Sequence, residues 1–220
     1  MFKGIVRFLL PLVALLSLGS AAAADATIDT NDPYAMVKAV ANKTFDRFHQ
    51  DKALIDADTD YLKVIVREEL MPYVDYKYAS YKVMGQYLRD TTEDQRARFV
   101  DAFEGYLVAT YAQAFTEYTN QKVEFSPAID FADEKIVDVN VQIIEAGRPP
   151  IKLQFKARRL KDDSWKAFDL VAEGVSLLAS KQAEVTNLIR QQGIESVISL
   201  LNEKTNQKVQ KASGKKEVKA

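Results

Sequence analysis

The sequence contains no cysteine, which excludes disulfide bonds, thiolate metal sites, catalytic cysteines and the acylated cysteine of a lipoprotein. It contains a single histidine, His49, so a histidine-rich metal cluster is excluded as well. Glycine-rich phosphate loops, dinucleotide-binding fingerprints and zinc-ligand spacings are also missing from the sequence. We therefore expect neither a metal site nor a cofactor.

Two further patterns that could carry catalysis are incomplete. Gly174-Val175-Ser176 begins like the nucleophile turn of a hydrolase, but Leu178 replaces the required glycine and no histidine lies nearby in sequence. Ser176 is predicted to cap the following helix instead. The acidic pairs Glu68–Glu69 and Asp162–Asp163 are predicted to be solvated. We predict no catalytic residue and hence no enzyme.

The first 24 residues have the pattern of a secretory signal. Lys3 and Arg7 precede an apolar run over residues 8–18, and small residues follow up to Ala24. The apolar run is too short for a membrane anchor, which needs about 20 residues. We expect cleavage before Asp25 and, because an exported chain without cysteine suits that compartment, location in a bacterial periplasm.

Charge divides the remaining chain into a body and a tail. Residues 25–201 carry 22 basic and 29 acidic side chains, and this net negative charge argues against nucleic acid as the partner. Residues 202–220 carry six lysines and two glutamates with little apolar content. We predict one domain over residues 25–201 and a disordered tail over 202–220. Weak attraction of the tail to an anionic membrane is the alternative.

Helical periodicity dominates the first half of the body. Asp32 and Pro33 predict a helix start, and Thr92 with Gln95 predicts a capping box that opens a long helix. A second and a third helix are predicted from Asp58 to Pro72 and from Tyr76 to Leu88. Eight of the ten tyrosines fall within residues 73–118. They are typical either of a core with tyrosines at its wet margins or of an apolar cavity with hydroxyls at its mouth.

After residue 120 the periodicity changes from 3.6 to two. Apolar and polar residues alternate over residues 136–144 and 151–158, and flanking strands are predicted at 121–125 and 164–171. Helices are predicted from residue 177 to 192 and again after Gly193. The pattern predicts an α+β domain with a four-stranded antiparallel sheet covered by helices.

A set of short motifs, in a fixed order, resembles the MlaC family of periplasmic phospholipid carriers. The resemblance extends over about residues 31–201 and rests on the segments Asn31–Tyr34, Lys43–Arg47, Glu69–Val74, Met84–Tyr87, Leu107–Tyr111, Trp165–Asp169 and Ala172–Leu177.

The resemblance implies a fold, a function and partners. The expected fold contains an NTF2-like sheet with an apolar lipid cavity between sheet and helices. The expected function is to shuttle phospholipid between an outer-membrane lipoprotein–porin complex and an inner-membrane ABC transporter with a ring of lipid-binding domains. This activity would maintain the lipid asymmetry of the outer membrane. Bound phospholipid would be cargo rather than a cofactor.

Periodicity suggests which side chains would contact the lipid. The candidates lie on the inward sheet face, on the long helix and at the turn after the last strand, which we take as the mouth. They are Val137, Val139, Val141, Ile143, Ile151, Leu153, Phe155, Phe103, Tyr106, Leu107, Tyr111, Gly174 and Val175. Each of the strand and helix positions is equally compatible with a closed core.

Charged residues near the long helix and on the wet face of the sheet are candidates for docking to protein partners, although such charges commonly only keep a protein soluble. They are Arg89, Arg96, Lys152, Lys156, Arg158 and Glu173. Two other functions stay open at this point. One is a periplasmic chaperone or adaptor that grips peptides, and the other is an NTF2-like enzyme, which would need a buried acid–base group.

Overall fold

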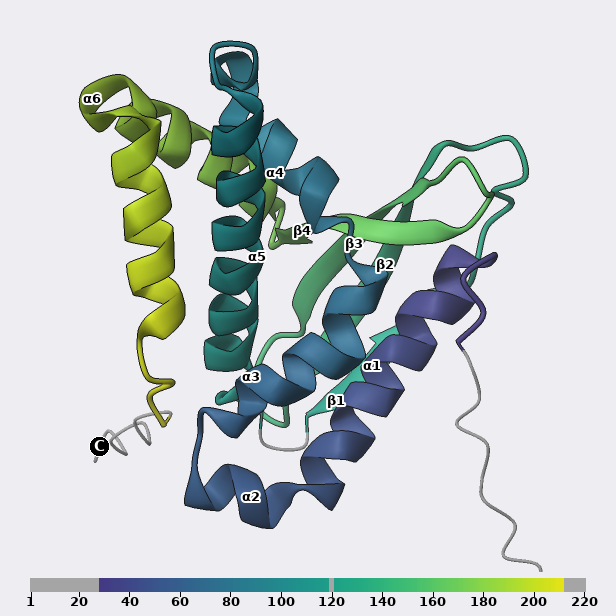
Figure 1. Cartoon of the computed structure of the whole chain (residues 1–220). Coiled ribbons are helices and arrows are strands. Elements are labelled where there is room, and N and C mark those ends of the chain that lie inside the picture. The colour runs from purple at the N-terminus through teal and green to yellow at the C-terminus, as the bar shows by residue number, and fades with distance from the viewer. Residues whose placement is uncertain (1–27, 119–120, 212–220) are drawn as a thin grey trace, which may run out of the picture.

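The computed structural model describes residues 28–118 and 121–211 (Figure 1). The predicted signal sequence lies outside the described residues. The helical elements are α1 Pro33–Gln50, α2 Lys52–Ala57, α3 Tyr61–Ile65, the π-helix η1 Val66–Leu70, the 3-10 helix η2 Met71–Tyr73, α4 Tyr76–Met84, the 3-10 helix η3 Gly85–Leu88, α5 Glu93–Phe115 and α6 Leu177–Asn206. The strands are β1 Lys122–Phe125, β2 Ile136–Ile144, β3 Ile151–Arg159, β4 Trp165–Ala172 and β5 Val175–Ser176.

The predicted helix caps are confirmed. The Asp32 side chain accepts hydrogen bonds from the backbone N–H groups of Tyr34 and Ala35 at 2.8 and 3.0 Å. Thr92 and Gln95 form a reciprocal capping box at the start of α5. Each cap satisfies backbone donors that lack a partner within the first turn of the helix.

The strands form one antiparallel sheet in the order β1-β2-β3-β4-β5. The predicted antiparallel sheet is confirmed, but it has five strands rather than four. Glu173 and Gly174 both have positive φ angles, of 49° and 81°, so the chain reverses directly after β4. Val175 and Ser176 then pair back onto β4 as a two-residue strand. This reversal depends on left-handed backbone conformations that strand periodicity does not reveal.

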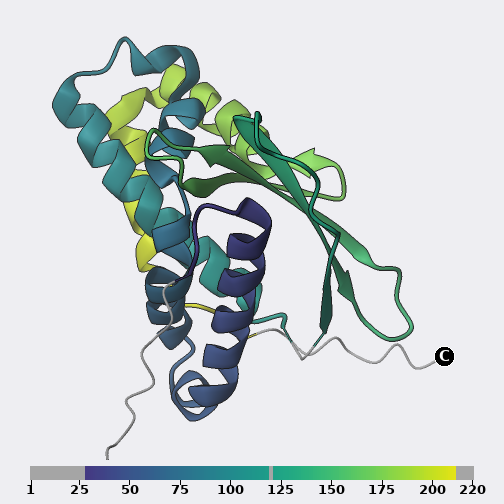
Figure 2. The ribbon, with the colours of Figure 1, turned by 90° about the vertical axis from the view of Figure 1, so that its right-hand side faces the viewer.

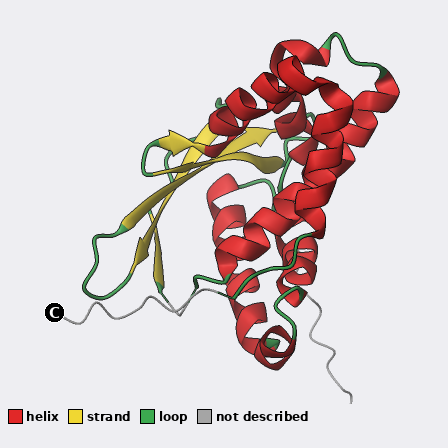
Figure 3. Cartoon of the chain, turned by 90° about the vertical axis from the view of Figure 1, so that its left-hand side faces the viewer, coloured by secondary structure: helices red, strands yellow, loops and turns green. Residues whose placement is uncertain are grey.

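The helices lie in two groups around the sheet (Figures 2 and 3). The sheet arches over α1, and side chains of α1 share a buried cluster with Val139, Ala157 and Trp165. Helices α4, α5 and α6 form a second cluster around Phe99 and Phe103. A third cluster joins the end of α1 to α3, η1 and the last turns of α5. The sheet is therefore supported on α1 at one side and on the α4–α5–α6 group at the other.

The helix predicted from Asp58 to Pro72 is interrupted. Tyr61–Ile65 is α-helical, but the chain continues as the wider π-helix η1 and then as η2. Within η1, Glu69 is buried with only 6% exposure, and it pairs with Arg47 and Lys43 at 2.8 and 3.2 Å. The prediction that Glu69 is solvated is wrong because α1 carries cations that face it.

The predicted break at Gly193 is confirmed, since this residue has φ 79° within α6. The predicted disordered tail is wrong for residues 202–211. Helix α6 continues to Asn206, and the buried Val209 donates its N–H to the Asp60 carboxylate at 2.8 Å. Lys63 donates to the carbonyl of Gln207 at 2.7 Å. Amino-acid composition does not reveal these contacts, because residues 202–211 make them through backbone groups and one apolar side chain. Residues 212–220 lie outside the described residues.

Gly105 of α5 packs against Thr205 of α6. A Cβ there would lie 2.8 Å from Cγ2 of Thr205, whose hydroxyl donates to the Leu201 carbonyl. Alanine is otherwise the better helix former, by about 1 kcal/mol. We expect Gly105→Ala to lower the free energy of unfolding by about 1–3 kcal/mol, as in overpacked cores.

The control is the same change in a Thr205→Ala background, where the obstructing atoms are absent. There we expect Gly105→Ala to raise the free energy of unfolding, measured by urea denaturation. Equal effects in the two backgrounds would contradict a steric role for Gly105.

Candidate functional site

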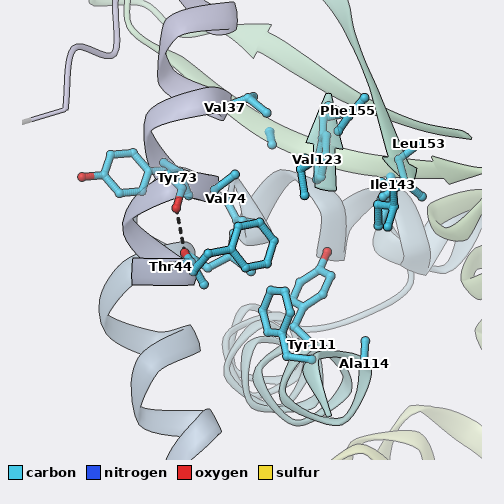
Figure 4. A pocket seen from close by; sticks show the side chains of 18 of the residues that line it. Val37, Thr44, Tyr73, Val74, Tyr111, Ala114, Val123, Ile143, Leu153 and Phe155 are labelled. Carbon is cyan, nitrogen blue, oxygen red and sulfur yellow. Dashed lines mark hydrogen bonds between the residues drawn. The ribbon is translucent and has the colours of Figure 1, made fainter. Parts of the chain in front are cut away.

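An apolar cavity of about 370 Å³ lies between α1, the last turns of α5 and the sheet (Figure 4). Its volume falls in the range of about 300–1,000 Å³ that is usual for small-molecule sites. Helix α1 and the η1–η2 segment supply one wall, and the strands supply the opposite wall. The lining residues include Val37, Val40, Phe45, Leu70, Val74, Phe115, Val123, Val141, Ile143, Leu153 and Phe155.

Exposure of the lining residues changes along the cavity. Met36 and Val40 are almost fully buried, at 1% and 5% exposure. Ala114, Glu117 and Ile151 line the same cavity but are exposed to solvent, Ile151 to 47%. The cavity therefore closes toward the start of α1 and opens where the end of α5 faces the start of β3.

Aromatic rings stiffen the wall between α1 and α5. Phe45 stacks on Tyr118 with ring centroids 4.4 Å apart, and Phe48 meets Phe115 edge to face at 4.9 Å. Such ring pairs add about 0.5–1.5 kcal/mol each beyond their buried area. The end of α5 is thus held firmly against α1, beside the opening.

Few polar groups border the cavity. The Thr44 hydroxyl is occupied by the Val40 carbonyl at 2.7 Å (Figure 4). The Asp169 carboxylate accepts hydrogen bonds from the Ser176 hydroxyl at 2.7 Å and from the Leu178 N–H at 3.0 Å. Burial, with a smaller contribution from Asp169, raises the pKa of Tyr111 to about 12. The Tyr111 phenol therefore stays protonated and is a hydrogen-bond donor at neutral pH.

The structure brings together six of the residues predicted to line a cavity. These six are Tyr111, Val141, Ile143, Ile151, Leu153 and Phe155. Val137 and Val139 lie on the same sheet face but pack in the closed cluster against α1. They therefore belong to the core of the domain.

The remaining predicted lipid contacts lie elsewhere. Phe103, Tyr106 and Leu107 pack toward α4 and α6, because only the last turns of α5 face the sheet. Gly174 and the exposed Val175 form the β4–β5 turn and do not line the cavity. Helical periodicity identifies an apolar face, but different segments of this 23-residue helix pack against different neighbours. Periodicity does not indicate which segment faces the sheet.

Sequence reasoning missed the contribution of α1, η1–η2 and β1 to the cavity. The spacing of Val37, Val40, Thr44 and Phe45 indicates a buried helix face, but it does not distinguish a core from a cavity wall. Asp169 was also missed, since it lies in a strand whose other residues are mostly apolar. No local sequence signal separates these residues from ordinary core positions.

Most of the predicted docking residues make contacts within the chain. Arg96 donates to the carbonyls of Leu88 and Thr91, and Lys156 pairs with Asp138 at 2.8 Å. Their charged groups are therefore already engaged within the domain.

Two more docking candidates have internal partners. Arg158 pairs with Asp75 at 2.5 Å and lies over the Tyr78 ring, and the Glu173 carboxylate accepts a hydrogen bond from the Lys152 N–H at 2.5 Å. The side chains of Arg89 and Lys152 are exposed.

The described residues contain no cluster of acidic and histidine side chains suited to a metal ion. Over residues 28–118 and 121–211, none of the helices is long and apolar enough to cross a membrane.

Comparison with known proteins identifies the family of this chain. Residues 38–203 match the family model described as MlaC protein. A Haemophilus influenzae protein named intermembrane phospholipid transport system binding protein MlaC is 34% identical over 184 residues, which is 83% of this chain and 86% of that protein. The solved structure of a phospholipid-binding protein from Ralstonia solanacearum, in complex with a phospholipid, superposes with a TM-score of 0.71 at 23% identity. That match covers 79% of this chain and 97% of the other, and it supports the fold. The chain belongs to the MlaC family.

Proposed function

We propose that this chain binds phospholipid in the apolar cavity and carries it across the periplasm between membranes. The observation that carries the proposal is the cavity itself, which is lined by apolar side chains and opens to solvent at one end. Two relatives support the cargo, because their names record phospholipid transport in one case and a bound phospholipid in the other.

The energetics explain why such a carrier needs a deep apolar cavity. Moving one methylene group out of water is worth about 0.8 kcal/mol, so an exposed sixteen-carbon tail is unfavourable by about 12 kcal/mol. A protein wall that replaces the membrane removes most of this barrier. The tails need no hydrogen bonds, which agrees with the small number of polar groups at the lining.

The same proposal covers the direction of lipid transport and the protein partners. The sequence has no nucleotide-binding motif, so the chain by itself equilibrates lipid between donors and acceptors. Net flux would come from the expected partners, an outer-membrane lipoprotein–porin complex and an inner-membrane ABC transporter. Arg89 and Lys152 are the docking candidates whose charged groups lie at the surface.

The test is the lipid content of the mature protein as purified without detergent. We expect organic extraction and mass spectrometry to release phospholipid in stoichiometric amount. A folded protein that yields no phospholipid, and that takes none up from vesicles of phosphatidylethanolamine and phosphatidylglycerol, would contradict the proposal and favour a peptide-binding adaptor.

A further inference from the structure

The hydroxyl group of Tyr111 lies within the apolar cavity. Figure 4 shows the ring rising from α5 with its oxygen directed toward the sheet, inside the cavity. The hydroxyl of Thr44 and the carboxylate of Asp169 both have partners within the chain. Tyr111 has no hydrogen-bond partner among residues 28–118 and 121–211.

A hydroxyl directed into an apolar cavity is available to a ligand acceptor. Tyr111 is half-buried, and tyrosine hydroxyls in apolar surroundings normally find a hydrogen-bond partner. The rise in the pKa of Tyr111 to about 12 shows that its surroundings disfavour the charged form strongly. The group is thus a neutral donor directed at whatever fills the cavity.

The position of Tyr111 along the cavity indicates which part of a lipid it would meet. Ala114, one helical turn further along α5, is exposed at the opening. Met36 and Val40 close the opposite end. A lipid whose tails fill the closed end and whose headgroup lies at the opening would place the junction between them near Tyr111.

The charges at the cavity favour a neutral acceptor over the phosphate as the partner. Among the residues that the structure describes, neither lysine nor arginine lines the cavity, and the two charged lining residues, Glu117 and Asp169, are acidic. A phosphate drawn in to the depth of Tyr111 would lose water without gaining a cation. An ester carbonyl is a neutral acceptor and carries no such penalty.

We propose that Tyr111 positions the cargo by donating a hydrogen bond to an ester carbonyl of the bound phospholipid. This inference rests on the proposed function. It makes Tyr111 a specificity determinant that favours ester-linked over ether-linked lipids, because an ether linkage lacks the carbonyl acceptor.

The experiment loads delipidated protein with an equimolar mixture of diacyl and dialkyl phosphatidylcholine of equal chain length. The ratio of the two lipids bound is then measured by extraction and mass spectrometry. We expect the wild type to favour the diacyl lipid about fivefold, the effect of one neutral hydrogen bond. Tyr111→Phe keeps the ring but should bind the two lipids equally. Because both lipids compete in the same sample, a change in the overall affinity for phospholipid does not by itself change the ratio of diacyl to dialkyl lipid bound.

Tyr106→Phe is the matched control. Tyr106 lies on the same helix as Tyr111 but packs toward α4 and α6, outside the cavity, so this variant should keep the wild-type ratio. Equal binding of both lipids by the wild type, or an unchanged preference in Tyr111→Phe, would overturn this inference and leave the proposed function intact. Failure to bind either lipid would instead overturn the proposed function.

Discussion

Replacement of Leu153 with tryptophan is expected to reduce the phospholipid content of the purified protein at least roughly tenfold while the domain stays folded. Leu153 lies on β3 at the middle of the sheet wall and faces the cavity (Figure 4). The larger indole would occupy space that acyl methylenes otherwise fill. Each displaced methylene weakens binding by about 0.8 kcal/mol, and two are sufficient for a tenfold loss.

The domain should tolerate this change because the new ring enters an existing cavity rather than a packed core. The matched control is Gln154→Trp, which places the same ring one residue along β3 on the opposite face of the sheet. Lipid content is measured by extraction, and folding by circular dichroism. A folded Leu153→Trp protein with wild-type lipid content would remove Leu153 from the binding wall.

The sheet and the helix ends were predictable because both depend on local chemistry. Alternation over β2 and β3 places Val141 and Leu153 on one face, and the structure pairs these two residues directly. Asp32 and Thr92 cap helices through bonds that reach only two or three residues along the chain. Such patterns involve residues that are close together in the sequence, so they can be recognised from the sequence alone.

The cavity was only half predictable because it depends on how distant elements meet. Tyr106 and Tyr111 lie on the same apolar stripe, but Tyr106 packs toward the α4–α6 group whereas Tyr111 faces the sheet. The ordered segment after residue 201 likewise depends on remote partners, such as Asp60 for the Val209 N–H. Periodicity indicates which face of a helix or strand is apolar. Tertiary packing determines whether that face packs in the closed core or lines a cavity.

A second large effect is expected at the ion-pair network that fixes α1 to η1. The Arg47 guanidinium contacts Glu69 at 2.8 Å, Asp51 at 2.5 Å and Glu68 at 3.0 Å. Glu69 is buried, and without Arg47 the one cation that remains within ion-pair distance of its carboxylate in the described part of the chain is Lys43, at 3.2 Å. Breaking a buried pair from one side usually lowers stability by about 3–5 kcal/mol. Arg47→Met should therefore lower the melting temperature by roughly 6–20 °C for a domain of this size.

Two further variants separate the buried charge from ordinary surface effects. Arg98 also bridges two carboxylates, Asp94 at 2.7 Å and Glu195 at 2.6 Å, but all three side chains are exposed. Arg98→Met should lower the free energy of unfolding by less than about 1 kcal/mol. Adding Glu69→Met to Arg47→Met removes the stranded carboxylate and should recover most of the lost stability. Thermal unfolding is measured for the wild type, Arg47→Met, Arg98→Met and the double variant. Equal losses of stability in Arg47→Met and Arg98→Met would mean that the burial of Glu69 contributes nothing.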